Sequence, residues 1–182
     1  MNNLSRSGAM LMVLMCLVGT GPVCAASSSD STKASGPSTV SKDDIAFFES
    51  AAQTGMTEVQ AAAIASSRAL GADTKSFASA MATDHTANNE ALKALAMRKG
   101  VSLPTQLDKT HQGLLADLQK EEPTRFDAAY AKDMTTGHKD AITLFEKTSK
   151  DSKDADIREF AKSTLPTLQH HLEMAKHLSE KS

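Results

Sequence analysis

The sequence predicts an all-α protein, a four-helix bundle with a long crossover connection that contains a short extra helix. Three observations lead to this prediction. Apolar residues recur at helical spacing over four long segments of the 182-residue chain. No segment alternates between apolar and polar residues as a half-buried strand does. No glycine-rich phosphate loop occurs either, so the nucleotide-binding folds are not indicated.

The first 40 residues are expected to lie outside the bundle. Arg6 precedes an apolar run over residues 8–19, and residues 23–25 (Val-Cys-Ala) offer small side chains at a cleavage site. This is the pattern of a secretory signal peptide, predicted over residues 1–25. The apolar run is shorter than the roughly 20 residues of a membrane span. Residues 26–40 are small and polar, which is typical of a flexible leader.

Both cysteines, Cys16 and Cys24, fall within the predicted signal. Cleavage after Ala25 or Ala26 therefore leaves no thiol for a disulfide, a nucleophile or a metal ligand. The alternative is a lipid anchor on Cys24, but Val23 does not suit a lipoprotein cleavage site. We expect a periplasmic or secreted protein without a lipid anchor.

The charge of the remaining chain argues against one class of partner. Without Arg6 it carries 19 basic and 22 acidic residues, a net charge of −3. A nucleic-acid-binding protein usually has a basic surface, so no nucleic acid is expected as a partner. No second apolar span follows the signal, so no membrane span is expected in the mature chain.

The bundle domain is predicted over residues 41–182. Ser41 is expected to cap the first helix, because Asp44 stands three residues later in a capping-box arrangement. The helix is predicted to run to about residue 70, with a kink at Gly55. Its apolar face is predicted to contain Ile45, Phe48, Ala52, Val59 and Ala63.

The second helix is predicted from Asp73, as its N-cap, to Lys99, and Gly100 closes it. A short helix over about residues 107–119 lies in the crossover. Pro123 suits the first turn of the third long helix, which runs to about residue 150.

The fourth long helix spans about residues 152–179 and is expected to kink at Pro166. Short turns join the first helix to the second and the third to the fourth, so each pair is antiparallel. The long stretch between the second and third helices makes those two parallel. One long crossover is the ferritin-like arrangement.

Several polar residues are expected to point inward at similar depth. Counting from the turns places Glu58 level with His85, and His138 within about 3 Å of that level along the axis. His171 is offset by roughly 7 Å on the same reckoning. The second and third helices also share an aromatic-x3-Met-x3-His pattern, carried by Phe77, Met81 and His85 and by Tyr130, Met134 and His138.

Three interpretations of this layer stay open. Glu58, His85, His138 and His171 are a reasonable ligand set for a transition metal such as zinc, copper or iron. A polar layer that satisfies its own hydrogen bonds needs no ion at all. Catalysis without a metal is the third interpretation, but no Ser-His-Asp pattern supports it.

Di-iron chemistry is disfavoured because its Glu-x-x-His signature is absent. Asp84 and His85 are adjacent and therefore point about 100° apart around the helix. We expect His85 to point inward and Asp84 to lie towards a flank or a neighbouring bond partner.

Four segments in this order resemble the exported bacterial family catalogued as domain of unknown function 4142: "AAQTGMTEVQAAAIAS", "KSFASAMATDHTANNEALKALAMRKGVSLP", "FDAAYAKDMTTGHKDAITLFEKT" and "REFAKSTLPTLQHHLEMA". The resemblance implies a ferritin-like bundle in the cell envelope and brings no established activity. The chain is also distantly similar to a second exported bundle family that carries Met-x-x-His-His, some of whose members are linked to copper. Asp84-His85 and Gly137-His138 depart from that motif, which weakens the second similarity.

We therefore expect an exported, non-enzymatic helical bundle, linked to envelope stress, whose inner layer binds a transition metal or serves as polar packing. Two alternatives are a metal-dependent redox or metal-sequestering protein and a module that docks an envelope protein partner.

Overall fold

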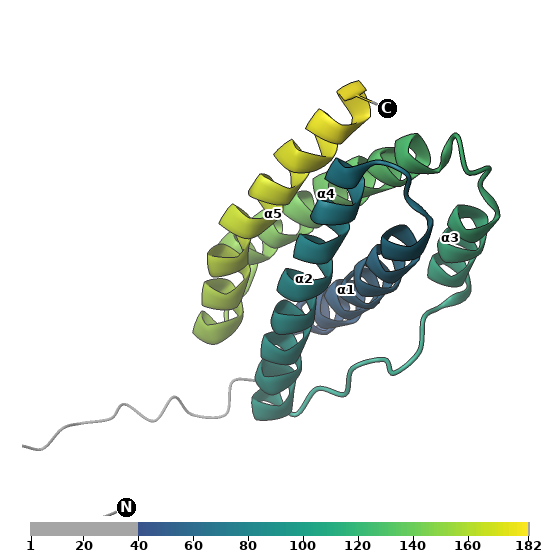
Figure 1. The fold of residues 1–182 in the computed structure, drawn as a ribbon. Coiled ribbons are helices and arrows are strands. Elements are labelled where there is room, and N and C mark those ends of the chain that lie inside the picture. The colour runs from purple at the N-terminus through teal and green to yellow at the C-terminus, as the bar shows by residue number, and fades with distance from the viewer. Residues whose placement is uncertain (1–39, 182) are drawn as a thin grey trace, which may run out of the picture. The chain divides into compact units, whose positions relative to one another are not determined.

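The computed structural model describes residues 40–181. The predicted signal peptide and all of the predicted leader except Val40 lie outside the described residues. Within them the protein is built of five α-helices and no strand (Figure 1), which confirms the all-α prediction. The helices are α1 (Lys42–Arg68), α2 (Ala72–Lys99), α3 (Lys109–Lys120), α4 (Phe126–Asp151) and α5 (Ala155–Lys181).

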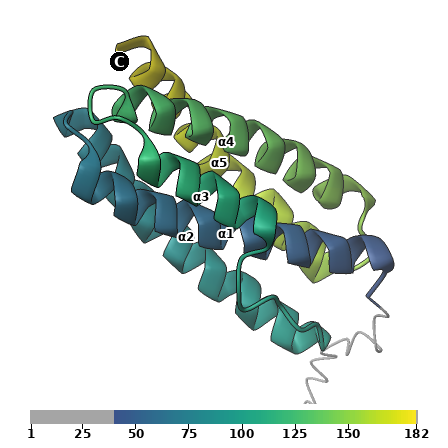
Figure 2. The ribbon, with the colours of Figure 1, turned by 90° about the vertical axis from the view of Figure 1, so that its right-hand side faces the viewer.

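The four long helices form a bundle. Helix α1 packs against α2 and α4 packs against α5, while α1 also contacts α4 and α2 also contacts α5. Helices α2 and α4 therefore face each other across a diagonal. Figure 2 shows them running in the same direction, with α3 running back between the end of α2 and the start of α4. The predicted crossover with its short helix is thus present.

The helix ends combine local and distant caps. The predicted capping box of α1 is confirmed, since the Asp44 backbone N–H donates to Ser41 Oγ and the Ser41 N–H donates to the Asp44 carboxylate. Asp73 does not cap α2, because Gly71 occupies that position. The carboxylate of Asp127, from the first turn of α4, instead accepts the N–H groups of Leu70 and Gly71.

The later helices begin a few residues after their predicted starts. Pro123 is not in the first turn of α4, because residues 123–125 form a separate turn in which the Arg125 N–H donates to the Glu122 carbonyl. Helix α5 begins after Asp154, whose carboxylate accepts the N–H groups of Asp156 and Ile157. Helix α5 continues through Pro166.

The hydrophobic core consists of two clusters, one towards each end of the bundle. The cluster at the α1–α2 turn contains Phe77, Met81, Phe126, Tyr130 and Met134. The cluster at the other end contains Phe47, Phe48, Leu92, Leu95, Phe145 and Ile157. Buried polar residues from the long helices separate the two clusters.

The predicted apolar face of α1 is only partly correct. Ile45 is 39% exposed and Ala63 is exposed, whereas the buried apolar residues of α1 are Phe47, Phe48, Ala51, Ala52, Ala61, Ala62 and Ala65. Helix α1 contacts α2, α3 and α4. It therefore buries a broad surface rich in alanine, and a small side chain gives little hydrophobic contrast from which to locate a face.

Candidate metal centre

Three helices bring three histidines together between the two core clusters. His85 comes from α2, His138 from α4 and His171 from α5, and all three are buried. The centroids of their rings are 5.2 to 5.6 Å apart. One ring nitrogen from each histidine lies within 4.8 Å of the others. This group, called the histidine triad below, is the centre of the polar layer.

The outward nitrogen of each ring has an oxygen acceptor. His85 Nδ1 lies 2.8 Å from Glu58 Oε2, His138 Nδ1 lies 2.8 Å from the carbonyl oxygen of Met134, and His171 Nε2 lies 2.9 Å from Asp84 Oδ2. A carbonyl or an ionised carboxylate can only accept a hydrogen bond. Each of these nitrogens therefore carries the hydrogen and donates it, which fixes the tautomer of the neutral ring.

The opposite nitrogen of each ring has no partner. Among the described residues, His85 Nε2, His138 Nε2 and His171 Nδ1 are buried without a hydrogen bond. In the neutral rings these three atoms carry lone pairs and no hydrogen. When all three rings are neutral, the triad therefore contains three buried acceptors that have no donor.

A buried carboxylate adds negative charge beside the triad. Glu58, on α1, is 3% exposed, and its Oε1 lies 3.5 Å from His138 Nδ1. Burial raises the pKa of Glu58, but the electrostatic influence and hydrogen bond of His85, together with the electrostatic influence of His138 and His171 in the acidic range where a carboxyl group titrates, outweigh it and hold that pKa below its ordinary value. Glu58 is therefore ionised at neutral pH.

The histidine rings of α4 and α5 are held neutral. Burial lowers the pKa of His138, and the neighbouring His85 lowers it further, against the opposite influence of Glu58 and the Met134 carbonyl. Burial also lowers the pKa of His171, despite its hydrogen bond to Asp84. At neutral pH both rings thus present a lone pair, which is the form that binds a metal ion.

The size of the triad suits a metal ion after a small contraction. The centre of an equilateral triangle with 4.8 Å sides lies about 2.8 Å from each corner. Zinc–imidazole bonds are about 2.0–2.1 Å long. Each nitrogen therefore has to move inward by at most roughly 0.7 Å, which is within the reach of small side-chain rotations.

The predicted site residues occupy distinct positions. His85, His138 and His171 lie together, whereas Glu58 is not part of this group and contacts it through His85 Nδ1. The shared sequence pattern also corresponds in space, because the rings of Phe77 and Tyr130 are 5.9 Å apart. The phenolic oxygen of Tyr130 has no hydrogen-bond partner among the described residues.

His171 fits the layer better than counting from the turn predicted. It lies 16 residues after the first residue of α5, and His138 lies 13 residues before the last residue of α4. The real difference is three residues, or about 4.5 Å, because α4 ends and α5 begins one residue later than the turn positions used for the prediction. Asp84 was expected near a flank or a bond partner, and it bonds to His171 across the α2–α5 contact. Sequence reasoning missed that specific partner and the Met134 carbonyl.

The remaining histidines do not join this group. His170 and His177 are exposed. His111 is half-buried at the start of α3, where its Nδ1 lies 2.8 Å from Asp108 Oδ1.

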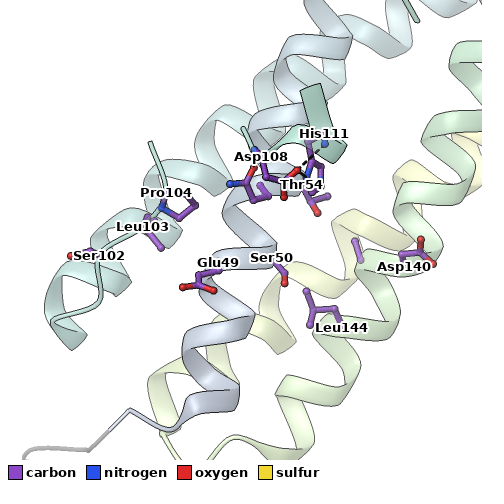
Figure 3. Close-up of a pocket in the computed structure, with 12 residues that line it drawn as sticks. Glu49, Ser50, Thr54, Ser102, Leu103, Pro104, Asp108, His111, Asp140 and Leu144 are labelled. Carbon is purple, nitrogen blue, oxygen red and sulfur yellow. Dashed lines mark hydrogen bonds and ion pairs between the residues drawn. The ribbon is translucent and has the colours of Figure 1, made fainter. Parts of the chain in front are cut away.

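A separate hollow of about 760 Å³ lies between three parts of the chain: helix α1, helix α4 and the segment that precedes α3. Figure 3 shows Glu49 and Ser50 on one wall and Asp140 on the other, with the Asp108–His111 pair at one end. Glu49, Asp108 and Asp140 are exposed. The hollow lacks the buried, unpartnered groups that distinguish the triad, so the triad is the better candidate site.

Comparisons with known proteins agree with this architecture. A family model described as a domain of unknown function (DUF4142) matches residues 29–178. A solved structure described as a crystal structure of a DUF305 fragment from Deinococcus radiodurans is similar in fold, with a TM-score of 0.71 and 12% sequence identity, and the match covers 80% of this chain and 100% of that one. No curated protein matches the chain. Of the helices within residues 40–181, none has the length and apolar content needed to cross a membrane.

Proposed function

The chain belongs to the family described as a domain of unknown function (DUF4142), and we propose that it binds one divalent late transition-metal ion, Zn²⁺ or Cu²⁺, through His85, His138 and His171. One observation carries the proposal. Three buried histidines place one ring nitrogen each within 4.8 Å of the others, and each ring keeps one buried nitrogen without a hydrogen-bond partner, although buried polar atoms nearly always have a partner. A cation that accepts three lone pairs accounts for this arrangement, and imidazole is a preferred ligand of these metals.

The surroundings of the triad support the proposal. Metal-binding histidines usually donate their other N–H to a carboxylate or a backbone carbonyl, which orients the ring and strengthens the ligand. Glu58, the Met134 carbonyl and Asp84 supply these three acceptors. The charge of Glu58 also favours a cation, because an isolated buried carboxylate is costly.

Addition of metal to the purified, chelator-treated protein tests the proposal. We expect one Zn²⁺ or Cu²⁺ per chain and a higher melting temperature. An ion at 100 times its dissociation constant stabilises the folded state by about 2.7 kcal/mol, which corresponds to a rise of roughly 5–10 °C for a domain of this size. Mg²⁺ should have no such effect, because it prefers oxygen ligands.

Two variants make the test specific. His138→Ala removes a buried ligand and should abolish the shift, whereas His170→Ala removes an exposed histidine next to His171 and should leave the shift intact. If neither Zn²⁺ nor Cu²⁺ raises the melting temperature of the parent protein, the triad is polar packing and the proposed function is wrong.

Export is part of the proposed function and is supported by the signal-peptide pattern of residues 1–25. A protein that holds a metal ion without a thiol ligand suits an oxidising compartment, where cysteines form disulfides. N-terminal sequencing of protein recovered from the periplasmic or secreted fraction should begin at Ala26 or Ser27. Recovery of the uncleaved chain in the cytoplasm alone would contradict export.

Copper redox chemistry is a second candidate, favoured by the number of ligands. Three protein ligands leave a coordination position open, which is typical of catalytic rather than structural metal sites. Ascorbate should then bleach the visible absorption of the Cu²⁺-loaded protein, and air should restore it over several cycles. If bleaching releases the copper, the protein binds Cu²⁺ without cycling it.

A further inference from the structure

The histidine triad is enclosed on one side of the bundle and approached on the other. All three histidines and Glu58 are buried, and neither Glu58 on α1 nor His138 on α4 lines the hollow described next. Towards solvent, a hollow of about 310 Å³ lies between α2 and α5, and His85 and His171 both line it. This hollow, called the vestibule below, therefore links two of the three candidate ligands to the surface.

The vestibule has the chemistry of a path for a hydrated cation. Asn88 and Thr164 line its walls, and the Thr164 hydroxyl lies 3.3 Å from Asn88 Oδ1. Ser163 and Thr167 are exposed and add two hydroxyl groups. Such oxygen atoms can replace water around a cation one at a time. No lysine or arginine is among the described residues that line the vestibule.

Asp84 connects the vestibule with the triad. Its side chain is 46% exposed and lines the vestibule, while its Oδ2 accepts a hydrogen bond from His171 Nε2. It is the acidic residue among the lining side chains. A carboxylate in this position attracts a cation from solvent and at the same time holds the His171 lone pair towards the triad.

We propose that the vestibule is the passage through which the metal ion enters and leaves the triad, with Asp84 as the residue that captures the ion at its mouth. This inference rests on the proposed function. Asp84 is a positioning residue for His171 and a transient ligand for the incoming ion, and it is not one of the three final ligands.

A variant with a blocked vestibule tests whether the metal ion passes through it. Thr167→Trp places a bulky side chain at an exposed position of the vestibule. The association and dissociation rates of Zn²⁺ should both fall by about tenfold or more, equivalent to at least ~1.4 kcal/mol of added barrier, while the dissociation constant stays the same. Stopped-flow mixing with free Zn²⁺ gives the first rate, and transfer to a chromogenic chelator gives the second.

A matched control is available on another helix. Thr143, on α4, is an exposed helical threonine that does not line the vestibule, so Thr143→Trp should leave both rates unchanged. If Thr167→Trp lowers the melting temperature of the metal-free protein, Ala87→Trp on the α2 wall provides the same block. Unchanged rates in a folded blocking variant would overturn the passage.

A second variant tests the role of Asp84. Asp84→Asn keeps an oxygen that accepts the His171 N–H but removes the charge. The association rate of Zn²⁺ should fall by about tenfold at low salt, within the range of electrostatic steering, and the difference should vanish near 1 M salt, where the screening length is about 3 Å. Equal rates and equal salt dependence in both proteins would overturn the assignment of Asp84.

The two proposals fail in different ways. If the parent protein binds no Zn²⁺ at all, the proposed function is overturned and this inference falls with it. If the parent binds Zn²⁺ and the blocking variants exchange it at the parent's rates, the metal site stands and only the passage is overturned.

Discussion

Glu58 shows how one side chain controls the state of its neighbours. It accepts the His85 N–H at 2.8 Å and lies 3.5 Å from His138 Nδ1. Its charge raises the pKa of His138 against the effect of burial and, after burial itself, also raises that of Tyr130. The electrostatics of the layer thus depend on a residue that does not face the three free nitrogens.

The first prediction concerns the charge of this residue. Glu58→Gln leaves an oxygen that accepts the His85 N–H but removes the negative charge. The affinity for Zn²⁺ should fall by about 10- to 100-fold, as is typical when a partner behind a metal-binding histidine is changed. Competition with a chelator of known affinity measures the change. Glu49→Gln, at an exposed position of the same helix, should not alter the affinity, and equal affinity in the Glu58 variant would contradict the role assigned here.

The second prediction concerns the Tyr130 hydroxyl. It is buried and has no partner among the described residues, so Tyr130→Phe removes an atom that makes no hydrogen bond. The rings of Phe77 and Phe126 stay 5.9 and 6.3 Å away. The free energy of unfolding should stay the same or rise by up to about 1 kcal/mol. A fall of 1 kcal/mol or more in urea unfolding would show that the hydroxyl has a water partner.

The residues of the layer could be predicted from the sequence, but their bonding could not. Helical spacing and turn positions suffice to place Glu58, His85 and His138 at one depth. Which ring nitrogen faces inward depends on the rotation of each ring and on acceptors from other helices, such as Asp84 for His171. No local pattern encodes a contact between residues 87 positions apart.

At the scale of helices, Gly55 marks a close approach. It was expected to kink the first helix, and α1 is one continuous helix on both sides of it. A Cβ atom at this position would lie 1.9 Å from Asn89 Oδ1 of α2. Glycine therefore lets the Asn89 side chain lie against the backbone of α1. Sequence reasoning identified the unusual residue but not its cause, because the cause lies on another helix.

The third prediction follows from this contact. Gly55→Ala gains about 1 kcal/mol of helix propensity but forces Asn89 to move, and overpacking of this kind costs about 1–3 kcal/mol. The free energy of unfolding should therefore stay the same or fall by up to about 2 kcal/mol in a urea titration. Gly113→Ala is the matched control, because nothing lies within 4 Å of a Cβ at that helical position, and it should stabilise the protein.

A second background tests the cause. In an Asn89→Ala protein the obstacle is gone, so adding Gly55→Ala should no longer destabilise the fold. If Gly55→Ala costs the same in both backgrounds, Asn89 is not the reason for the glycine.

Helix ends show the same limit of sequence reasoning. The capping box of α1 is local and was predicted, whereas the turn before α2 is held by Asp127, more than 50 residues away, which accepts the N–H groups of Leu70 and Gly71. The starts of α4 and α5 were predicted two to three residues early. A separate turn over residues 123–125 precedes α4, and Asp154 caps α5 locally, so the sequence predicted that these helices exist more reliably than where they begin.

At the scale of the whole molecule, the polar layer divides the core into two clusters. The layer joins α1, α2, α4 and α5 through Glu58 and the three histidines. All four side chains are buried in the folded protein. A change in the protonation of these groups therefore changes the free energy of unfolding of the whole bundle.

The fourth prediction is an acid-sensitive fold in the absence of metal. Burial lowers the pKa of His138 and His171 in the folded protein, so the unfolded chain binds more protons as the pH falls through about 6.5, the ordinary histidine pKa. The free energy of unfolding is then highest above that pH. It declines as the pH falls towards the lowered pKa values of the two folded-state histidines. Glu58, whose folded pKa is lowered, adds a further loss as the pH drops below about 4.5.

Urea unfolding in the presence of a chelator, from pH 8 to pH 5, measures this dependence. Two histidines that each take up one proton on unfolding give a slope of at most about 2.7 kcal/mol per pH unit. His138→Gln cannot take up a proton there, so its slope over this range should be about half that of the parent. His177→Gln, at an exposed position, should retain the parent slope. A stability that stays flat or rises as the pH falls from 7.5 to 5 would contradict the burial of neutral histidines, because histidine pKa values lowered in the folded state make it less stable over this pH range.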